Sequence, residues 1–171
     1  MYALDANTTA SNNVAFGYQS LSAVTTSGNN TAVGFQSLLV NTGDTNTAVG
    51  YLAMDANTTG TNNIAVGDNA LGANTTAANN TAIGSQALAA NTTAAGNTAV
   101  GAYALDANVT DEGNTAIGSY ALTNSNGGES NTAVGNGALN DCTTGDNNTA
   151  VGRLALYALN GGAGNVAVGK D

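Results

Sequence analysis

The pentapeptide N-T-A-V-G at residues 30–34 decides the fold, because the chain writes this phrase, with small variations, ten times. Nine of the resulting repeats have 17 residues and one has 16. A strict short period predicts a solenoid-like array with one coil per repeat. We therefore expect a single array over residues 1–169, followed by a two-residue tail at 170–171. The repeats are 1–17, 18–34, 35–50, 51–67, 68–84, 85–101, 102–118, 119–135, 136–152 and 153–169.

Each repeat is numbered here from slot 1 to slot 17, with the closing glycine in slot 17. Slot 14 is β-branched in every copy, slot 16 is Val, Ile or Phe, and slot 15 is always Ala. β-Branched residues favour strands, and residues two apart in a strand share a face. Slots 13–16 therefore predict a short strand of an all-β fold, with slots 14 and 16 facing the interior.

The alanine of slot 15 is then expected to face outward, where ten unvaried methyl groups indicate close packing against something else. We predict that these alanines form an interface between chains. Slot 3, which is always Ala or Ser, predicts a second contact surface of the same kind. The predicted interface residues are Ala15, Ala32, Ala48, Ala65, Ala82, Ala99, Ala116, Ala133, Ala150 and Ala167.

The rest of the repeat predicts one further core position, a corner and a loop. Slot 4 is Leu in nine copies and Met54 in the other, which predicts an inward side chain. Slots 1–5 suit either a strand or a single helical turn, and both interpretations stay open. The slot 17 glycine predicts positive φ or a close backbone approach at a corner. Slots 5–12 have the composition of turns and loops.

Slot 13 is Asn in all ten copies. Stacked coils would place these amides about 4.8 Å apart, where they can hydrogen-bond along the stack. We predict a structural ladder, and a row that binds sugars or ions is the alternative. The ladder residues are Asn13, Asn30, Asn46, Asn63, Asn80, Asn97, Asn114, Asn131, Asn148 and Asn165.

The repeat N-T-A-V-G followed by Y-Q-S-L or S-Q-A-L resembles the head repeats of YadA-type trimeric adhesins. It is also similar to the G-N-T-A-I-G-Y-x-A-L arrays of bacteriophage tail-fibre proteins, with matches at residues 46–53, 97–101 and 114–121. The resemblance implies a left-handed parallel β-roll and a side-by-side homotrimer. The repeat here is 17 residues against about 14 in the adhesin heads, so its loop is longer.

Composition excludes several classes of function. The net charge is −9 with only two basic residues, which disfavours nucleic-acid binding, and no apolar run is long enough to predict membrane insertion. With no His and one Cys, the chain lacks the usual catalytic bases, nucleophiles and zinc ligands, so we expect neither an enzyme nor a cofactor. The pair Asp111 and Glu112, and Asp141 with Asp146, predict at most a weak Ca²⁺ site.

We therefore expect a structural and adhesive fibre segment: a rigid extracellular rod on a virion tail or a cell surface. The alternative is a solenoid that binds ice or another crystal surface through Thr rows in slots 8 and 9. Neither end resembles a capping repeat, which predicts a longer fibre or a filament of subunits stacked head to tail. Tyrosines in slots 1 and 2 suit either stacking on a cell-surface glycan or packing at the corner. The tyrosines named for glycan contact are Tyr18, Tyr51, Tyr103 and Tyr120.

Overall fold

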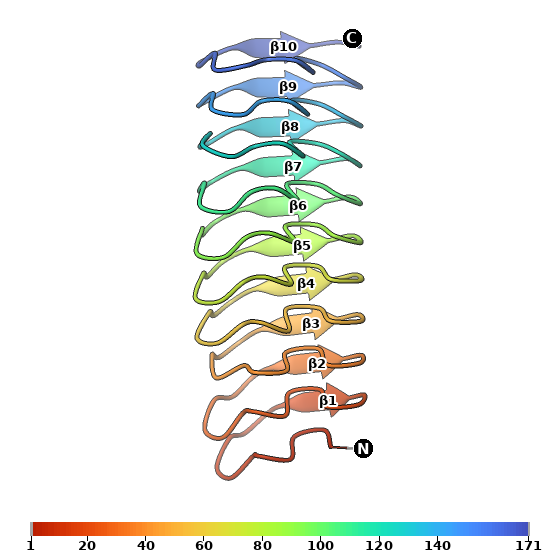
Figure 1. The fold of residues 1–171 in the computed structure, drawn as a ribbon, viewed down its shortest axis with the longest axis vertical. Coiled ribbons are helices and arrows are strands. Elements are labelled where there is room, and N and C mark those ends of the chain that lie inside the picture. The colour runs from red at the N-terminus through yellow and green to blue at the C-terminus, as the bar shows by residue number, and fades with distance from the viewer. Residues whose placement is uncertain (1, 171) are drawn as a thin grey trace.

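The computed structural model describes residues 2–170, which form a straight β-solenoid with the N-terminus at one end and the C-terminus at the other (Figure 1). Each repeat contributes one three-residue strand in slots 14–16, within the predicted slots 13–16, and the slot 13 Asn precedes the strand. The strands are β1 (Val14–Phe16), β2 (Thr31–Val33), β3 (Thr47–Val49), β4 (Ile64–Val66), β5 (Thr81–Ile83), β6 (Thr98–Val100), β7 (Thr115–Ile117), β8 (Thr132–Val134), β9 (Thr149–Val151) and β10 (Val166–Val168).

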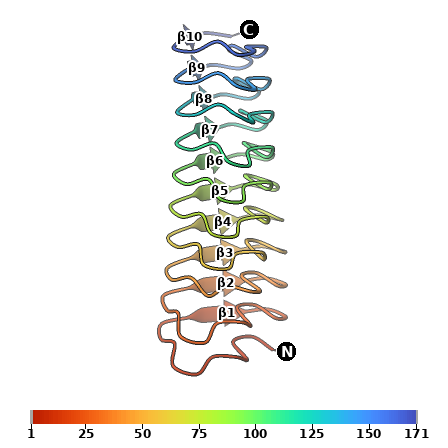
Figure 2. The ribbon, with the colours of Figure 1, turned by 60° about the vertical axis from the view of Figure 1, so that its left-hand side comes forward.

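The strands form one parallel sheet in the order β1 to β10. Each slot pairs with the same slot of the next coil, so Ala99 lies beside Ala116. Figure 2 shows the strands in single file, with the turns and loops of each coil beside them. The 16-residue third repeat keeps this register, because Thr31 pairs with Thr47 and the missing residue is absorbed in a loop. The prediction of an all-β solenoid with coils of about 17 residues is confirmed.

The prediction of which side of the strand faces inward is wrong. The slot 15 alanines from Ala32 to Ala150 have no exposed surface and belong to the core. The flanking slots point outward, with Ile83 and Ile117 about 40% exposed (40% and 41%). Slot 3 is also buried from Ser20 onward, so the small residues line the interior of the coil instead of a contact surface.

The narrow coil explains this inversion. The interior is filled from the opposite wall by the slot 4 leucines, such as Leu88 and Leu105, which are fully buried as predicted. With a Leu already in each layer, the strand has room for only a methyl group on its inner side, since interiors pack at crystal-like density. The core of each coil therefore admits only alanine in slot 15, and the larger β-branched residues lie on the outer side of the strand.

Slots 1–6 form neither a strand nor a helix, but a series of turns. Every slot 4 residue has a left-handed backbone, with φ between 50° and 54°. Neighbouring coils are linked here by backbone bonds such as Leu88 N–H to Ala104 O (3.0 Å) and Tyr103 N–H to Ser85 O (3.0 Å). The left-handed conformation costs roughly 1–2 kcal/mol per residue, whereas burying a leucine contributes about 1.5–3 kcal/mol. The buried side chain therefore offsets the backbone strain.

The slot 17 glycines have both features predicted for them. Their φ angles lie between 133° and 151°, a region that favours glycine. A Cβ on Gly101 would lie 2.5 Å from the carbonyl carbon of Gly118 in the next coil. Glycine is therefore required at this corner by conformation and by space.

Candidate functional site

The outward side chains of slots 14 and 16 form a continuous surface over β1 to β10, which we name the strand face. Slot 14 contributes seven Thr, and slot 16 contributes Val, Ile or Phe. None of its twenty side chains is charged. The strand face comprises Val14, Thr31, Thr47, Ile64, Thr81, Thr98, Thr115, Thr132, Thr149 and Val166, and Phe16, Val33, Val49, Val66, Ile83, Val100, Ile117, Val134, Val151 and Val168.

The predicted chain interface at the slot 15 alanines has to be corrected. Eight of these side chains are fully buried inside their own chain, and Ala15 and Ala167, in the outermost coils, are half-buried. A buried methyl group cannot touch another chain. A contact on this side of the rod would use the strand face instead. The corrected residues are Ala15, Ala32, Ala48, Ala65, Ala82, Ala99, Ala116, Ala133, Ala150 and Ala167.

The slot 13 asparagines form a single row of side-chain to backbone hydrogen bonds. In each step the backbone N–H of one Asn donates to the Oδ1 of the Asn in the preceding coil, as from Asn97 to Asn80 (2.8 Å). The Nδ2 group donates to a loop carbonyl of the following coil, as from Asn80 to Ala94 O (2.8 Å). Asn30 to Asn148 are buried, so these amides are committed to holding coils together. The row therefore offers little to a sugar or an ion.

A second ladder, in slot 7, was not foreseen. Asn74 Nδ2 donates to Asn57 Oδ1 (2.7 Å) and Asn91 Nδ2 donates to Asn74 Oδ1 (3.1 Å), with all three side chains buried. The signal in the sequence was the recurring N-T-T, which was interpreted only as a turn. The slot 8 hydroxyls are also engaged, since Thr58 Oγ1 donates to the Thr75 carbonyl of the next coil (2.9 Å). Of the two Thr rows suggested for a crystal surface, the slot 8 row therefore serves the solenoid itself, whereas slot 9 threonines such as Thr76 and Thr93 are exposed.

Aromatic side chains stack in two columns along the coil corner that follows the glycine. Tyr18, Phe35 and Tyr51 form the first column, with 5.4 Å between successive ring centroids. Tyr103 and Tyr120 form the second column, with centroids 5.2 Å apart and planes within 4°. All five side chains remain exposed. Stacking between coils is the corner packing that was one of the two sequence-based interpretations of these rings.

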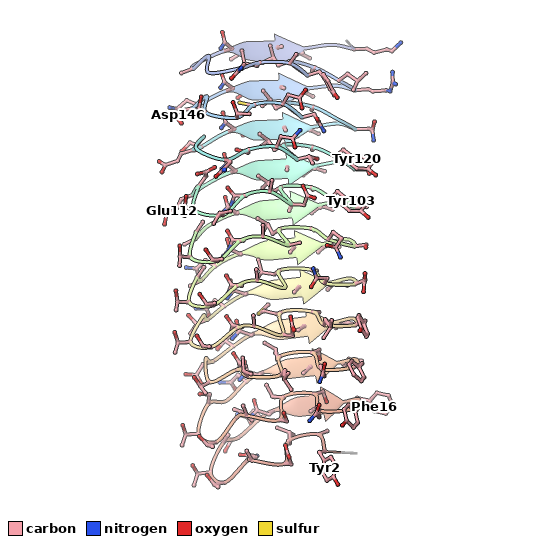
Figure 3. All side chains as sticks on the ribbon, viewed as in Figure 1. Tyr2, Phe16, Tyr103, Glu112, Tyr120 and Asp146 are labelled. Atoms are coloured by element: carbon pink, nitrogen blue, oxygen red, sulfur yellow. The ribbon has the colours of Figure 1, made fainter. Side chains whose placement is uncertain are left out.

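Acidic side chains gather on the opposite edge, where Figure 3 shows Glu112 and Asp146 far from Tyr103 and Tyr120. The Asp111 carboxylate accepts hydrogen bonds from the backbone N–H groups of Gly127 and Gly128. Likewise, Asp146 accepts one from Glu129 N–H (2.9 Å).

Asp141 Oδ1 accepts a hydrogen bond from Asn124 Nδ2 (2.7 Å). Within residues 2–170, no three acidic, Cys or His side chains gather closely enough to hold a metal ion. Three of the acids named for Ca²⁺, which are Asp111, Asp141 and Asp146, thus accept hydrogen bonds from groups of neighbouring coils.

Among the described residues 2–170, three titratable groups have pKa values that burial raises. Desolvation raises the pKa of Asp55 and of Asp106 from the ordinary value of 3.8, against backbone hydrogen bonds that lower it. One oxygen of Asp106 is buried without a hydrogen-bond partner. Burial likewise raises the pKa of the Cys142 thiol, which lies in slot 7 near Gly145 O (3.7 Å). These groups sit in separate coils, so no acid–base pair results.

No protein-family model, curated protein or solved structure matches this chain. Residues 2–170 contain no helix long and apolar enough to cross a membrane. The function is therefore inferred from the surfaces of the molecule.

Proposed function

We propose that this protein is a structural and adhesive segment of an extracellular fibre, on a virion tail or a cell surface, and that its rods pack side by side as homotrimers. The observation that carries the proposal is the strand face. It runs along the whole sheet, is lined by Thr, Val, Ile and Phe, and carries no charge in a chain of net charge −9. Copies of so acidic a chain repel one another everywhere except where charge is absent.

The dimensions of the strand face favour three chains over two. Ten strands spaced about 4.8 Å apart and about 10 Å long give a strip of roughly 480 Å². Exposed apolar patches of a few hundred Å² mark interaction sites, yet a stable pair usually buries about 800 Å² on each partner. Three rods around a common axis also bring together the coil surfaces on either side of each strip, so each chain buries more than the strip alone. A trimer is also what the resemblance to the adhesin and tail-fibre repeats implies.

A rod function also agrees with where the hydrogen bonds lie. Backbone ladders, two amide ladders and a hydroxyl row all run along the axis and join each coil to the next. A load along the rod is thus shared by many parallel bonds. This arrangement suits a spacer that holds a tip away from a surface.

Charge substitution on the strand face tests the proposal, with sedimentation equilibrium as the readout. We expect the unmodified chain to have three times the monomer mass. The strand-face variant should be monomeric, because lysines buried between the chains would have no partner charge. The control places the same three changes on exposed threonines of slot 9 in the same coils and should stay trimeric. A monomeric parent, or a strand-face variant that stays trimeric, would contradict the proposal. The strand-face variant combines Thr81→Lys, Thr98→Lys and Thr115→Lys, and the control combines Thr76→Lys, Thr93→Lys and Thr110→Lys.

Binding to ice or another crystal surface is the second candidate, favoured by one observation. Seven outward Thr of slot 14 recur along the flat strand face at the coil spacing. The slot 8 hydroxyls bond the next coil, so the slot 14 row takes their place as the candidate crystal-binding surface. Thermal hysteresis of the purified parent, absent from the strand-face variant and kept by the slot 9 control, would support this function. A parent that shows no hysteresis rules it out.

A further inference from the structure

The two aromatic columns lie in neighbouring slots of the corner that follows the glycine, the first in slot 1 and the second in slot 2, and two polar coils separate them along the rod. The first column ends at Tyr51 in the fourth coil, and the second begins at Tyr103 in the seventh. Three coil steps of about 4.8 Å separate these residues by roughly 14 Å along the axis. In the two coils between them, slot 1 holds Asp68 and Ser85, and slot 2 holds Asn69 and Gln86.

The ring geometry leaves aromatic surface open. Centroids 5.2–5.4 Å apart with nearly parallel planes describe offset stacking and not full face-to-face overlap. Part of each ring face is therefore uncovered, and Tyr51 and Tyr103 are 54% and 38% exposed. Figure 3 shows Tyr103 projecting from the edge of the rod. At their inner ends the columns give way to the polar coils instead of to further rings.

The polar side chains between the two columns can form hydrogen bonds with hydroxyl groups. Asp68 is exposed and provides carboxylate acceptors. Asn69 Nδ2 donates to Gln86 Oε1 (3.2 Å), which fixes two neighbouring amides side by side across coils. A linked amide pair presents both donors and acceptors to solvent along the corner. Aromatic, polar and aromatic surfaces thus follow one another along the rod across two neighbouring slots.

We propose that this corner, formed by Tyr51, Asp68, Asn69, Gln86 and Tyr103, binds a neutral oligosaccharide lying lengthwise along the rod. The C–H-rich faces of pyranose rings pack on the open tyrosine faces. Hydroxyls between them bond the carboxylate and the amides. Acidic saccharides are disfavoured by Asp68 and by the net charge of −9. The site adds a ligand to the adhesive rod proposed above, and its residues lie outside the strand face.

Titration calorimetry with a panel of saccharides tests the site. The probes are the pentasaccharides of cellulose, laminarin, amylose and chitin, a sialylated trisaccharide and a polyproline peptide. We expect at least one neutral pentasaccharide to bind, and its dissociation constant to rise about tenfold when Tyr51→Ala and Tyr103→Ala are combined. The control combines Tyr18→Ala and Tyr120→Ala, which removes the outer ring of each column and should leave affinity unchanged.

Three results would overturn the proposal: no neutral saccharide binds, both double variants lose affinity equally, or the peptide or the sialylated probe binds better. Repeating the titration on the strand-face lysine variant separates the two proposals. Binding that persists in a monomer supports the corner site independently of association. Loss of association alone would refute only the trimer.

Discussion

Asn80 offers the sharpest test of how the coils are held together. Its Oδ1 accepts the backbone N–H of Asn97 (2.8 Å) and its Nδ2 donates to Ala94 O (2.8 Å), and the side chain is fully buried. Asn80→Ala would leave that N–H buried without a partner, whereas Ala94 O would keep only its bond from Asn91 Nδ2 (3.1 Å). The orphaned N–H costs about 1–3 kcal/mol and the lost bond to Ala94 O about 0.5–1.5 kcal/mol, so the expected loss in the free energy of unfolding is roughly 1.5–4.5 kcal/mol. The backbone N–H of Asn80 keeps its own bond to Asn63 Oδ1 (2.9 Å).

Native-state hydrogen exchange at the Asn97 amide is the best assay, because repeat arrays do not always unfold in one step. We expect a large loss of protection at Asn97 and at the amides of the adjoining coils, together with a lower melting temperature. The matched control is Asn165→Ala, in the last coil, where the side chain is exposed and bonds mainly to Asn148 Oδ1 (2.9 Å). It should cost less than about 1 kcal/mol. Equal effects of the two substitutions would refute the view that the buried ladder joins the coils.

Three further predictions concern charge, space and backbone strain. Because burial raises the folded-state pKa of Asp106 above its ordinary 3.8, ionisation destabilises the fold as pH rises through that range. Asp106→Asn should therefore raise the melting temperature near neutral pH and leave it unchanged below about pH 3. Gly101→Ala should destabilise strongly, since its Cβ would meet backbone at 2.5 Å, whereas Gly169→Ala meets nothing within 4 Å and should cost only its φ strain. Thr45 is β-branched and has a φ of 61°. Thr45→Gly should therefore raise the free energy of unfolding, measured by chemical denaturation, by about 1 kcal/mol. The reverse change, Gly96→Thr at φ 73°, should lower the free energy of unfolding by a similar amount. A more stable Gly96→Thr variant would contradict the strain argument.

The period of the sequence determined most of the architecture. A glycine every 16 or 17 residues, after a triplet of a β-branched residue, Ala, and Val, Ile or Phe, was enough to place ten strands and their register. Hydrogen-bond pairing between identical slots follows directly from such a repeat. The corner glycines were also predictable, because no other residue tolerates both their φ and the neighbouring backbone.

Hydrophobicity alone could not predict which side of the strand faces the core. Larger side chains usually mark the interior, but here Ala99 is inside and Val100 lies on the strand face. The deciding factor was the volume already taken by residues such as Leu105 on the opposite wall. That wall depends on left-handed leucines, a conformation uncommon enough that no propensity suggests it. The slot 7 ladder was missed because Asn in N-T-T is equally typical of a turn.

The orientation of the strand is the central claim, and single cysteines in β7 test it directly. In a Cys142→Ser background, which resembles the Ser125 already present in slot 7, Cys would replace Thr115, Ala116 or Ile117 in turn. Thiol labelling is measured against the unfolded chain and repeated on dilution, which exposes any surface covered by association. We expect the Ala116→Cys thiol to stay protected at every concentration, because that position is fully buried in its own coil. The Thr115→Cys and Ile117→Cys thiols should react readily once chains are separated. Labelling of Ala116→Cys as fast as either neighbour would contradict the inward alanine, and with it the strand face.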